Sequence, residues 1–263
     1  MGGQLPHLFI SQGSQSFPYT YPGSGGSGGT RLPVRDPAIH GAKLRRDLIT
    51  VGLDQIAVDI ERTQKKIEAE ASQINFDIDP NKGFKPQSLE NASSGISLSL
   101  IQMKPDGGGH AVVRVPKGEV ATFFRKLEQY KDPNLRTITG KPKNQPLFAC
   151  ISGIRIPTLR DFWTGPDDLL PTEDKAYHWE VWVRREEGAT QLRNQANRLN
   201  VSIGQQTLTF PDREVVLATS TPQAMKELLR LVDSVTEVRP PNLVAQFLEM
   251  KPKEQSEWSL ETV

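Results

Sequence analysis

The sequence predicts an α+β fold, and three patterns along the chain indicate it. A long helical pattern covers residues 37–72, shorter strand and helix patterns alternate from 94 to 156, and residues 177–239 follow the order strand, helix, strand, strand, helix, strand. The last order is typical of the split-βαβ or ferredoxin-like fold. We therefore expect antiparallel sheets with helices packed on one face of each.

Composition narrows the class of protein. The 263 residues include 32 Lys and Arg against 31 Asp and Glu, and the net charge of +1 provides no excess of cations for a phosphate backbone. A single cysteine, Cys150, cannot form an internal disulfide, and no run approaches 18 apolar residues. We therefore expect a soluble cytoplasmic protein that binds neither membrane nor nucleic acid.

Residues 1–36 differ from the rest of the chain. Glycines and serines fill 23–29, prolines follow, and few apolar residues are present to offset the entropy of ordering. We expect a flexible tail, whose Gly/Ser run is either a natural tether or an introduced linker. A phosphate-binding loop is disfavoured because the run lacks a preceding strand and a Lys-Ser/Thr end.

The predicted helix over 37–72 is amphipathic. Asp36 is a good N-cap and Pro37 suits the first helical turn. An apolar stripe recurs at helical spacing and consists of Ile49, Leu53, Ile56, Ile60 and Ile67. We expect this stripe to pack on the chain's own domain, and docking of another protein on it is the alternative.

An αβ unit is predicted within 94–170. Two strands at 94–103 and 111–115 flank a Gly-rich turn, a helix covers 120–130, and an apolar stretch covers 147–156. This order is consistent with a second, decorated version of the unit predicted for 177–239.

The pattern over 177–239 is the most regular. Strands are predicted at 177–184, 207–210, 214–219 and 234–239, and a helix at 189–199. A further helix begins at Thr221-Pro222, an N-cap followed by a proline at the first helical position. Pro240-Pro241 ends the last strand, and residues 240–263 are predicted to run on as an extended segment.

The sequence contains no recognisable catalytic or metal-binding motif. The histidines (His7, His40, His110 and His178) are widely separated, and no Gly-x-Ser-x-Gly motif occurs. Cys150 lies in an apolar run and is predicted to be buried, and the acidic residues around 167–174 are predicted to be solvated. We therefore assign no catalytic residue, no metal ligand and no cofactor.

A protein interface is the alternative to a catalytic site. Trp179 and Trp182 are three residues apart on a predicted strand, so their side chains point to opposite faces. One can fill the core beneath the helices, and the other lies on the open face of the sheet. A face that no part of the chain covers needs a partner.

Several motifs resemble the N-terminal region of a group of bacterial subtilisin-like serine peptidases. These are Pro6–Phe9, the Gly-rich stretch 23–29, Pro33–Asp36, His40–Leu44 and the sequence FLEMKPKEQSEW at 247–258. The unit at 177–239 is also similar to subtilisin propeptides, which adopt a ferredoxin-like fold and pack their sheet on the catalytic domain. The catalytic motifs of the family (Asp-Thr/Ser-Gly, His-Gly-Thr and Gly-Thr-Ser-Met) do not occur, so no catalytic residue is carried over.

The resemblance implies a prodomain-like region that assists folding of a subtilisin-like peptidase, inhibits it, or docks a regulator. One of the two tryptophans packs on the peptidase domain in this hypothesis. The segment after Arg239 (Pro240, Pro241, Asn242, Leu243 and Val244) runs toward its active-site cleft. Such peptidases are often encoded beside an AAA-type ATPase and implicated in phage defence. The alternative is an adaptor that recruits an AAA-type ATPase through the N-terminal helix and tail, and a self-contained enzyme is disfavoured.

Overall fold

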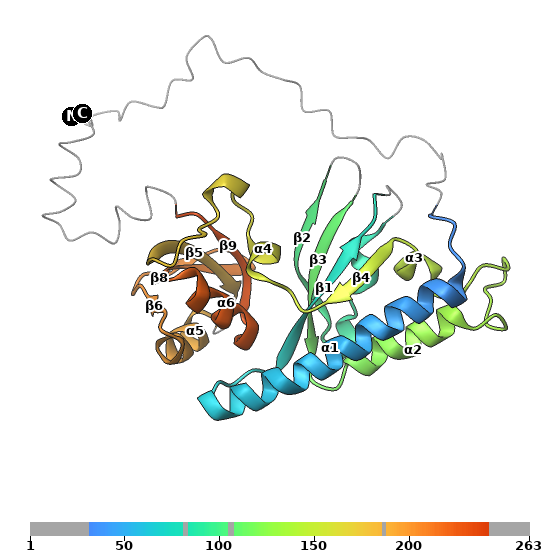
Figure 1. The fold of residues 1–263 in the computed structure, drawn as a ribbon, viewed down its shortest axis with the longest axis horizontal. Helices are drawn as coiled ribbons and strands as arrows, with labels where there is room; N and C mark the ends of the chain where they lie inside the picture. The colour runs from blue at the N-terminus through green and yellow to red at the C-terminus, as the bar shows by residue number, and fades with distance from the viewer. Residues whose placement is uncertain (1–31, 81–83, 105–107, 186–187, 242–263) are drawn as a thin grey trace, which may run out of the picture. The chain divides into compact units, whose positions relative to one another are not determined.

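Two antiparallel sheets and a long N-terminal helix form the α+β fold of this protein (Figure 1). The computed structural model describes residues 32–80, 84–104, 108–185 and 188–241. The predicted tail over 1–36 and the predicted extended segment over 240–263 therefore fall largely outside the described residues. In the described part of the tail, Leu32 packs against the hydrophobic core that contains Leu44 and Phe76. Arg35 forms an ion pair with Asp79.

Helix α1 (Pro37–Lys65) begins as predicted and ends earlier than predicted. The Asp36 carboxylate accepts hydrogen bonds from the backbone N–H groups of Ala38 and Ile39, at 2.8 and 3.1 Å. At the other end, Lys66 adopts a left-handed conformation and its N–H bonds to the carbonyls of the last turn. The predicted end at Ser72 is therefore wrong, because Ser72 lies in a strand that was not predicted from the sequence.

That strand, β1 (Ala71–Ile78), is central in the first sheet. The sheet has the order β2-β3-β1-β4, with β2 at Ser97–Met103, β3 at Gly109–Pro116 and β4 at Ile151–Arg155. Helix α2 (Val120–Lys131) packs beside α1 on one face of it, and Ile74, Phe76 and Phe123 lie in the core between them. The short helices are α3 (Gln145–Phe148), α4 (Leu159–Phe162), and the 3-10 turns η1 (Pro86–Leu89), η2 (Ala92–Ser94), η3 (Asp167–Leu169) and η4 (Asn197–Leu199).

The second sheet has the predicted order of strands and helices over 177–239. Its strands are β5 (Tyr177–Arg184), β6 (Ser202–Ile203), β7 (Leu208–Thr209), β8 (Arg213–Ser220) and β9 (Val235–Arg239). They follow the order β6-β8-β5-β9, with β7 also paired to β8. Helices α5 (Gly188–Ala196) and α6 (Pro222–Leu231) share one core with β5. The one difference is an additional short strand, β6, which lies before the predicted strand at 207–210, where β7 is found.

The two sheets have the same spatial order. We number the strands of each sheet in chain order and leave β7 aside. In both sheets the second strand then lies at one edge, followed by the third, the first and the fourth. All of these strand pairs are antiparallel. Helix α1 precedes the first strand of its sheet, whereas α5 follows the first strand of the other. The first half therefore contains an αβ unit with the strand order of the second sheet, and that unit begins at β1 rather than at the predicted residue 94.

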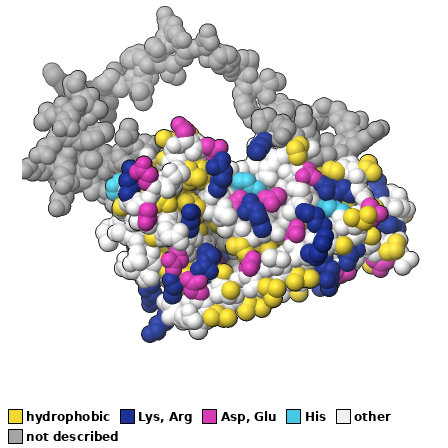
Figure 2. Space-filling view, in the orientation of Figure 1, with side chains coloured by type: hydrophobic (Ala, Val, Ile, Leu, Met, Phe, Trp, Pro, Cys, Tyr) yellow, Lys and Arg dark blue, Asp and Glu magenta, His cyan; other side chains and the backbone are white. Residues whose placement is uncertain are grey.

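The stripe that was expected to pack α1 onto its own domain is on the wrong side of the helix. The buried side chains of α1 are His40, Leu44, Leu48, Val51, Val58 and Arg62. Ile49, Leu53, Ile56 and Ile60 are exposed, and Figure 2 shows a band of hydrophobic side chains along the surface where α1 runs. Both sets satisfy the helical period, so periodicity alone could not identify the inner one. Ile67 is buried, but it lies beyond the end of the helix.

The other face of the first sheet meets the second sheet through polar contacts. Arg114 on β3 pairs with the buried Asp233 at 3.0 Å, and the amide of Gln73 on β1 donates to the carbonyl of Val235 at 2.7 Å. Arg62 of α1 donates to the carbonyl of Leu231 at the end of α6, at 2.8 Å. These hydrogen bonds join the second sheet and the end of α6 to the first sheet and α1. No helix within the described ranges is long and apolar enough to cross a bilayer.

Candidate functional site

The predicted interface residues Trp179 and Trp182 lie on opposite faces of β5. Trp179 is fully buried under α5 and α6, where its indole N–H donates to the carbonyl of Ser220 at 3.1 Å. Trp182 points to the face that carries no helix and is half-buried. The predicted split between a core tryptophan and a face tryptophan is therefore confirmed, and Trp182 is the one that lies on the open face.

Trp182 is held by residues of the turn between β7 and β8, of β9 and of β5 itself. The ring of Phe210 stacks on it with centroids 5.2 Å apart and an interplanar angle of 19°. The guanidinium carbon of Arg239 lies 4.2 Å from the indole centroid, within the range of a cation–π interaction. The indole N–H donates to Glu180 at 2.6 Å. We call Trp182, Phe210, Arg239 and Glu180 the Trp182 cluster.

The cluster is partly exposed and mixed in charge. Phe210 is 42% exposed, and the neighbouring Leu208 on β7 is 48% exposed. Arg239 also contacts the carboxylate of Glu237, which accepts a further hydrogen bond from the Thr164 hydroxyl. Aromatic residues and arginine are the types enriched in protein interfaces, whereas the carboxylates of Glu180 and Glu237 are typical of an interface rim.

The remaining predicted interface residues follow β9. Pro240 and Pro241 are half-buried, and Pro240 lies against the loop at Gly165, where an added Cβ would come within 2.4 Å of the proline ring. Asn242, Leu243 and Val244 lie outside the described residues. The chain therefore leaves the sheet at the same edge as Arg239 of the Trp182 cluster.

Sequence reasoning identified Trp182 and missed Phe210, Arg239 and Glu180. Their signal was weak because it depends on register: Glu180 is the antiparallel partner of Arg239, and Trp182 is the partner of Val215. A sequence pattern gives the face of each residue along one strand, but it does not give the offset between strands.

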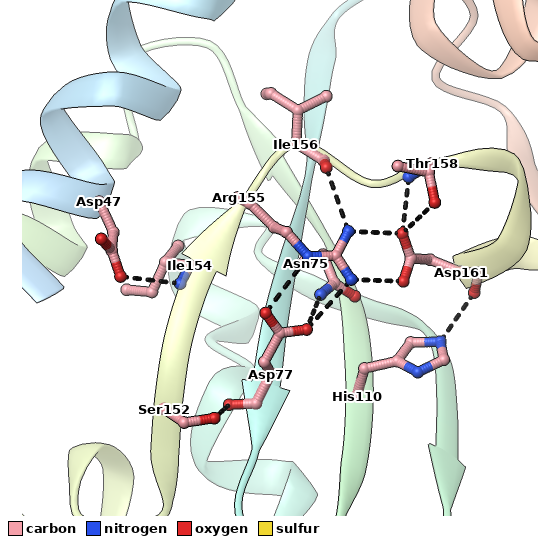
Figure 3. Close-up of polar contacts among 10 residues, drawn as sticks. All are labelled: Asp47, Asn75, Asp77, His110, Ser152, Ile154, Arg155, Ile156, Thr158 and Asp161. Atoms are coloured by element: carbon pink, nitrogen blue, oxygen red, sulfur yellow. Dashed lines mark hydrogen bonds and ion pairs between the residues drawn. The ribbon is translucent and has the colours of Figure 1, made fainter.

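A second polar cluster surrounds Arg155 at the end of β4 (Figure 3). Its guanidinium donates to both oxygens of Asp161 at 2.6 Å and to both oxygens of Asp77 at 3.1 and 3.2 Å. The Thr158 backbone N–H and hydroxyl also donate to Asp161, each at 2.7 Å, and close the capping box of α4. His110 hydrogen-bonds to the backbone carbonyl of Asp161 at 3.0 Å, which requires that its Nε2 carries the proton.

The electrostatics of this cluster are those of a structural clamp. Burial alone would raise the pKa of Asp161, but hydrogen bonds from Arg155 and Thr158 outweigh it and hold the pKa below its usual value. The same pair raises the pKa of Arg155 above its ordinary range. A base must be able to take up a proton near neutral pH, and this carboxylate is stabilised in its ionised form. The cluster therefore joins β1, β4 and α4 through an ionised carboxylate.

A polar cleft of about 980 Å³ lies between α5 and the segment that connects α1 to β1. Its lining mixes cations (Lys117, Arg184 and Arg198) with Glu68 and Glu70, and the amide of Gln195 donates to the carbonyl of Glu68 at 2.8 Å. Burial and the nearby Arg114 lower the pKa of Arg184. The lining consists of hydrogen-bonding and charged side chains, and its described residues include no histidine or cysteine.

The other residues considered for chemistry lie on separate elements. Cys150 is fully buried, as predicted, and burial raises the pKa of its thiol. His40 is buried between Tyr130 and the carbonyl of Ile151, and His178 is exposed next to Thr219. His7 lies outside the described residues. Among residues 32–80, 84–104, 108–185 and 188–241, no three metal-ligating side chains gather. The acidic residues Asp167, Asp168, Glu173 and Asp174 are exposed, as expected.

Comparison with known proteins adds no family to this description. No protein-family model matches the chain, and no curated protein matches it in sequence.

Proposed function

We propose that this chain is a non-catalytic docking module that binds a protein partner through the Trp182 cluster. In this proposal the second sheet, with α5 and α6 on one face, is a ferredoxin-like unit whose free face is the contact surface. The observation that carries the proposal is the half-buried Trp182, stacked on Phe210 and covered by Arg239, on a sheet face without a helix.

The physical argument rests on preorganisation. Binding costs the entropy of every side chain that becomes ordered, and an indole already held by a stacked ring, a guanidinium and a carboxylate has little left to lose. Tryptophan, tyrosine and arginine are also the residues whose truncation most weakens protein interfaces. The Trp182 cluster supplies two such anchors within one small area.

The partner we propose is a subtilisin-like peptidase domain. The N-terminal motifs resemble that family, and the strand order of the second sheet supports an arrangement of the propeptide kind. Docking of the sheet would assist the folding of the peptidase or inhibit it.

The test mixes the full chain with a separately purified subtilisin-like peptidase domain of the group that the motifs resemble. Calorimetry measures affinity, and cleavage of a peptide substrate measures inhibition. We expect Trp182→Ala to weaken binding about 10- to 100-fold. Leu169→Ala, which truncates an exposed leucine (53% exposed) outside the cluster, is the matched control and should bind as the unmodified chain does.

Two results would contradict the proposal. One is the absence of any binding or inhibition by the unmodified chain. The other is equal binding by Trp182→Ala and Leu169→Ala, which would place the contact elsewhere on the protein.

A further inference from the structure

Helix α1 carries an apolar stripe that the rest of the described chain leaves uncovered. The outer stripe consists of Ile49, Leu53, Ile56 and Ile60, which are 39%, 63%, 59% and 56% exposed. On its other sides the same helix packs against α2, β4 and α6. Four large aliphatic side chains in a row on one helix form a patch rather than scattered surface residues.

The borders of the outer stripe are small or neutral. Gly52, Thr50 and Ala57 stand beside it, and an added Cβ at Gly52 would meet no atom within 4 Å. Successive residues of a helix are rotated by about 100° around its axis, so Asp54 projects well away from the stripe. Asp59 forms an ion pair with Arg62 at 3.0 Å. Between Ile49 and Ile60, a second helix could therefore approach this side closely without placing a charged side chain in the seam.

The spacing of the stripe is symmetric. The steps between its residues are four, three and four, so the sequence positions mirror each other about the point between Asp54 and Gln55. An antiparallel copy of the same helix then places Ile49 opposite Ile60 of the second copy and Leu53 opposite Ile56. The same operation places Gly52 opposite Ala57, which keeps the two small borders together. Alternating steps of three and four are the pattern of a two-helix seam.

The charge of Arg46 favours the antiparallel orientation. Arg46 continues the stripe by one step of three toward the N-terminus and is exposed. In a parallel pair in register it would face Arg46 of the second copy in the seam, which is unfavourable for like charges. In the antiparallel pair it faces Thr63 of the second copy instead.

We propose that a second copy of this chain covers the outer stripe, and that the two α1 helices pair antiparallel about a two-fold axis between Asp54 and Gln55. The contact is isologous, as in most symmetric dimers. The stripe is only about 17 Å long at about 1.5 Å per residue. A contact of this length along one helix buries less than the roughly 800 Å² per partner of a standard interface. The dimer is therefore reversible and depends on protein concentration.

Sedimentation of the full chain over a range of concentrations tests association. The mass should rise toward twice that of the chain as concentration increases. Leu53→Glu should weaken association by about 100-fold or more, because the symmetry introduces a charge into the seam twice. Ile138→Glu is the matched control, because Ile138 is fully exposed on the loop before α3. This variant should dimerise as the unmodified chain does.

Single-cysteine variants test the orientation. Cys150 is the only cysteine and is fully buried, so an introduced thiol is the reactive one. Near the two-fold axis, Leu53→Cys should form a disulfide with its own copy. The cysteines of two Ile60→Cys chains would lie about 16 Å apart along the helices, so this variant should link only when mixed with Ile49→Cys.

Each alternative occupant gives a different result. A monomer at every concentration overturns the proposal and leaves the stripe to a different protein, as the adaptor hypothesis requires. Self-linking of Ile60→Cys overturns the antiparallel arrangement. Dimerisation that Leu53→Glu does not affect, with the variant folded by circular dichroism, places the dimer contact elsewhere.

Discussion

Arg155 on β4 and Asp161 on α4 form a two-pronged ion pair with both hydrogen bonds at 2.6 Å. The side chain of Asp161 is 7% exposed and that of Arg155 is 41% exposed, so one partner is buried and the other reaches solvent. Through Asp77, the same guanidinium also reaches β1. This relationship fixes the segment that leads from the first sheet to the second.

Asp161→Asn should lower the free energy of unfolding by about 2 kcal/mol, because the buried end of the pair loses its charge while Arg155 keeps Asp77 and solvent. Urea unfolding monitored by circular dichroism measures the change. The control is Arg160→Ala, which breaks the exposed pair between Arg160 and Asp167 and should cost no more than about 0.5 kcal/mol. Equal effects of the two variants would refute the clamp.

His40 should make stability depend on pH. Burial lowers the pKa of His40 from its ordinary value of 6.5, so the folded protein binds fewer protons than the unfolded chain when the pH falls below that value. Stability is therefore retained above 6.5 and decreases toward acid, by at most about 1.4 kcal/mol per pH unit for this one group. Urea unfolding between about pH 5.5 and about pH 8 measures the slope.

The matched variants for this slope are His40→Gln and His178→Gln. His40→Gln should be less stable than the unmodified protein at neutral pH. Its stability should also depend less steeply on pH, because the contribution of His40 is removed. His178→Gln changes an exposed histidine on β5 and is the control for replacing a histidine by glutamine. An unchanged slope in His40→Gln would assign the pH dependence to other groups.

The two tryptophans of β5 should differ sharply in their effect on stability. Trp179→Ala removes a fully buried indole from the core and should cost about 3 to 5 kcal/mol. Trp182→Ala removes a half-buried ring and its cation–π contact with Arg239, and should cost about 1 kcal/mol. Thermal unfolding of both variants checks this order, and the reverse order would contradict the assignment of the two faces.

Gly109 at the start of β3 should not accept a side chain. An added Cβ would lie 2.0 Å from the backbone oxygen of Gln102, and φ at this residue is +156°. Gly109→Ala should therefore cost about 2 to 3 kcal/mol. Gly52→Ala, in the middle of α1 with no atom near the added Cβ, should instead stabilise the protein by about 0.5 to 1 kcal/mol. Chemical unfolding of the pair separates a steric clash from the general effect of replacing glycine.

Several elements were predictable because the evidence for them is local. Helix α2 follows from the spacing of Phe123 and Leu127, which are both buried. Helix α6 follows from Thr221, whose hydroxyl accepts a hydrogen bond from the backbone N–H of Ala224 as an N-cap does. The position of Cys150 follows from its apolar neighbours. In each case the residues that decide the outcome are close together in the chain.

Strand β1 was missed for a different reason. All but one of its residues are buried, and polar Ser72, Gln73 and Asn75 are among them. Gln73 is buried because the second sheet lies against the first, where its amide donates to the carbonyl of Val235. Ser72 lies on the opposite face with Ile74 and Phe76. A polar residue next to an apolar one looks like a surface position until the element that covers it is known.

The sequence by itself determined the α+β class, the order of strands and helices over 177–239 and the opposite orientation of Trp179 and Trp182, because these depend on periods of 2 and 3.6 residues within single elements. Only the tertiary structure decided which stripe of α1 faces the core, which strands flank Trp182 and what neutralises Arg155. These depend on residues far apart in the chain, such as Leu48 against the first sheet and Arg239 over Trp182. Helix α1 has two apolar stripes that satisfy the same period, and only the packing of α2 and the first sheet selects one and leaves the other exposed.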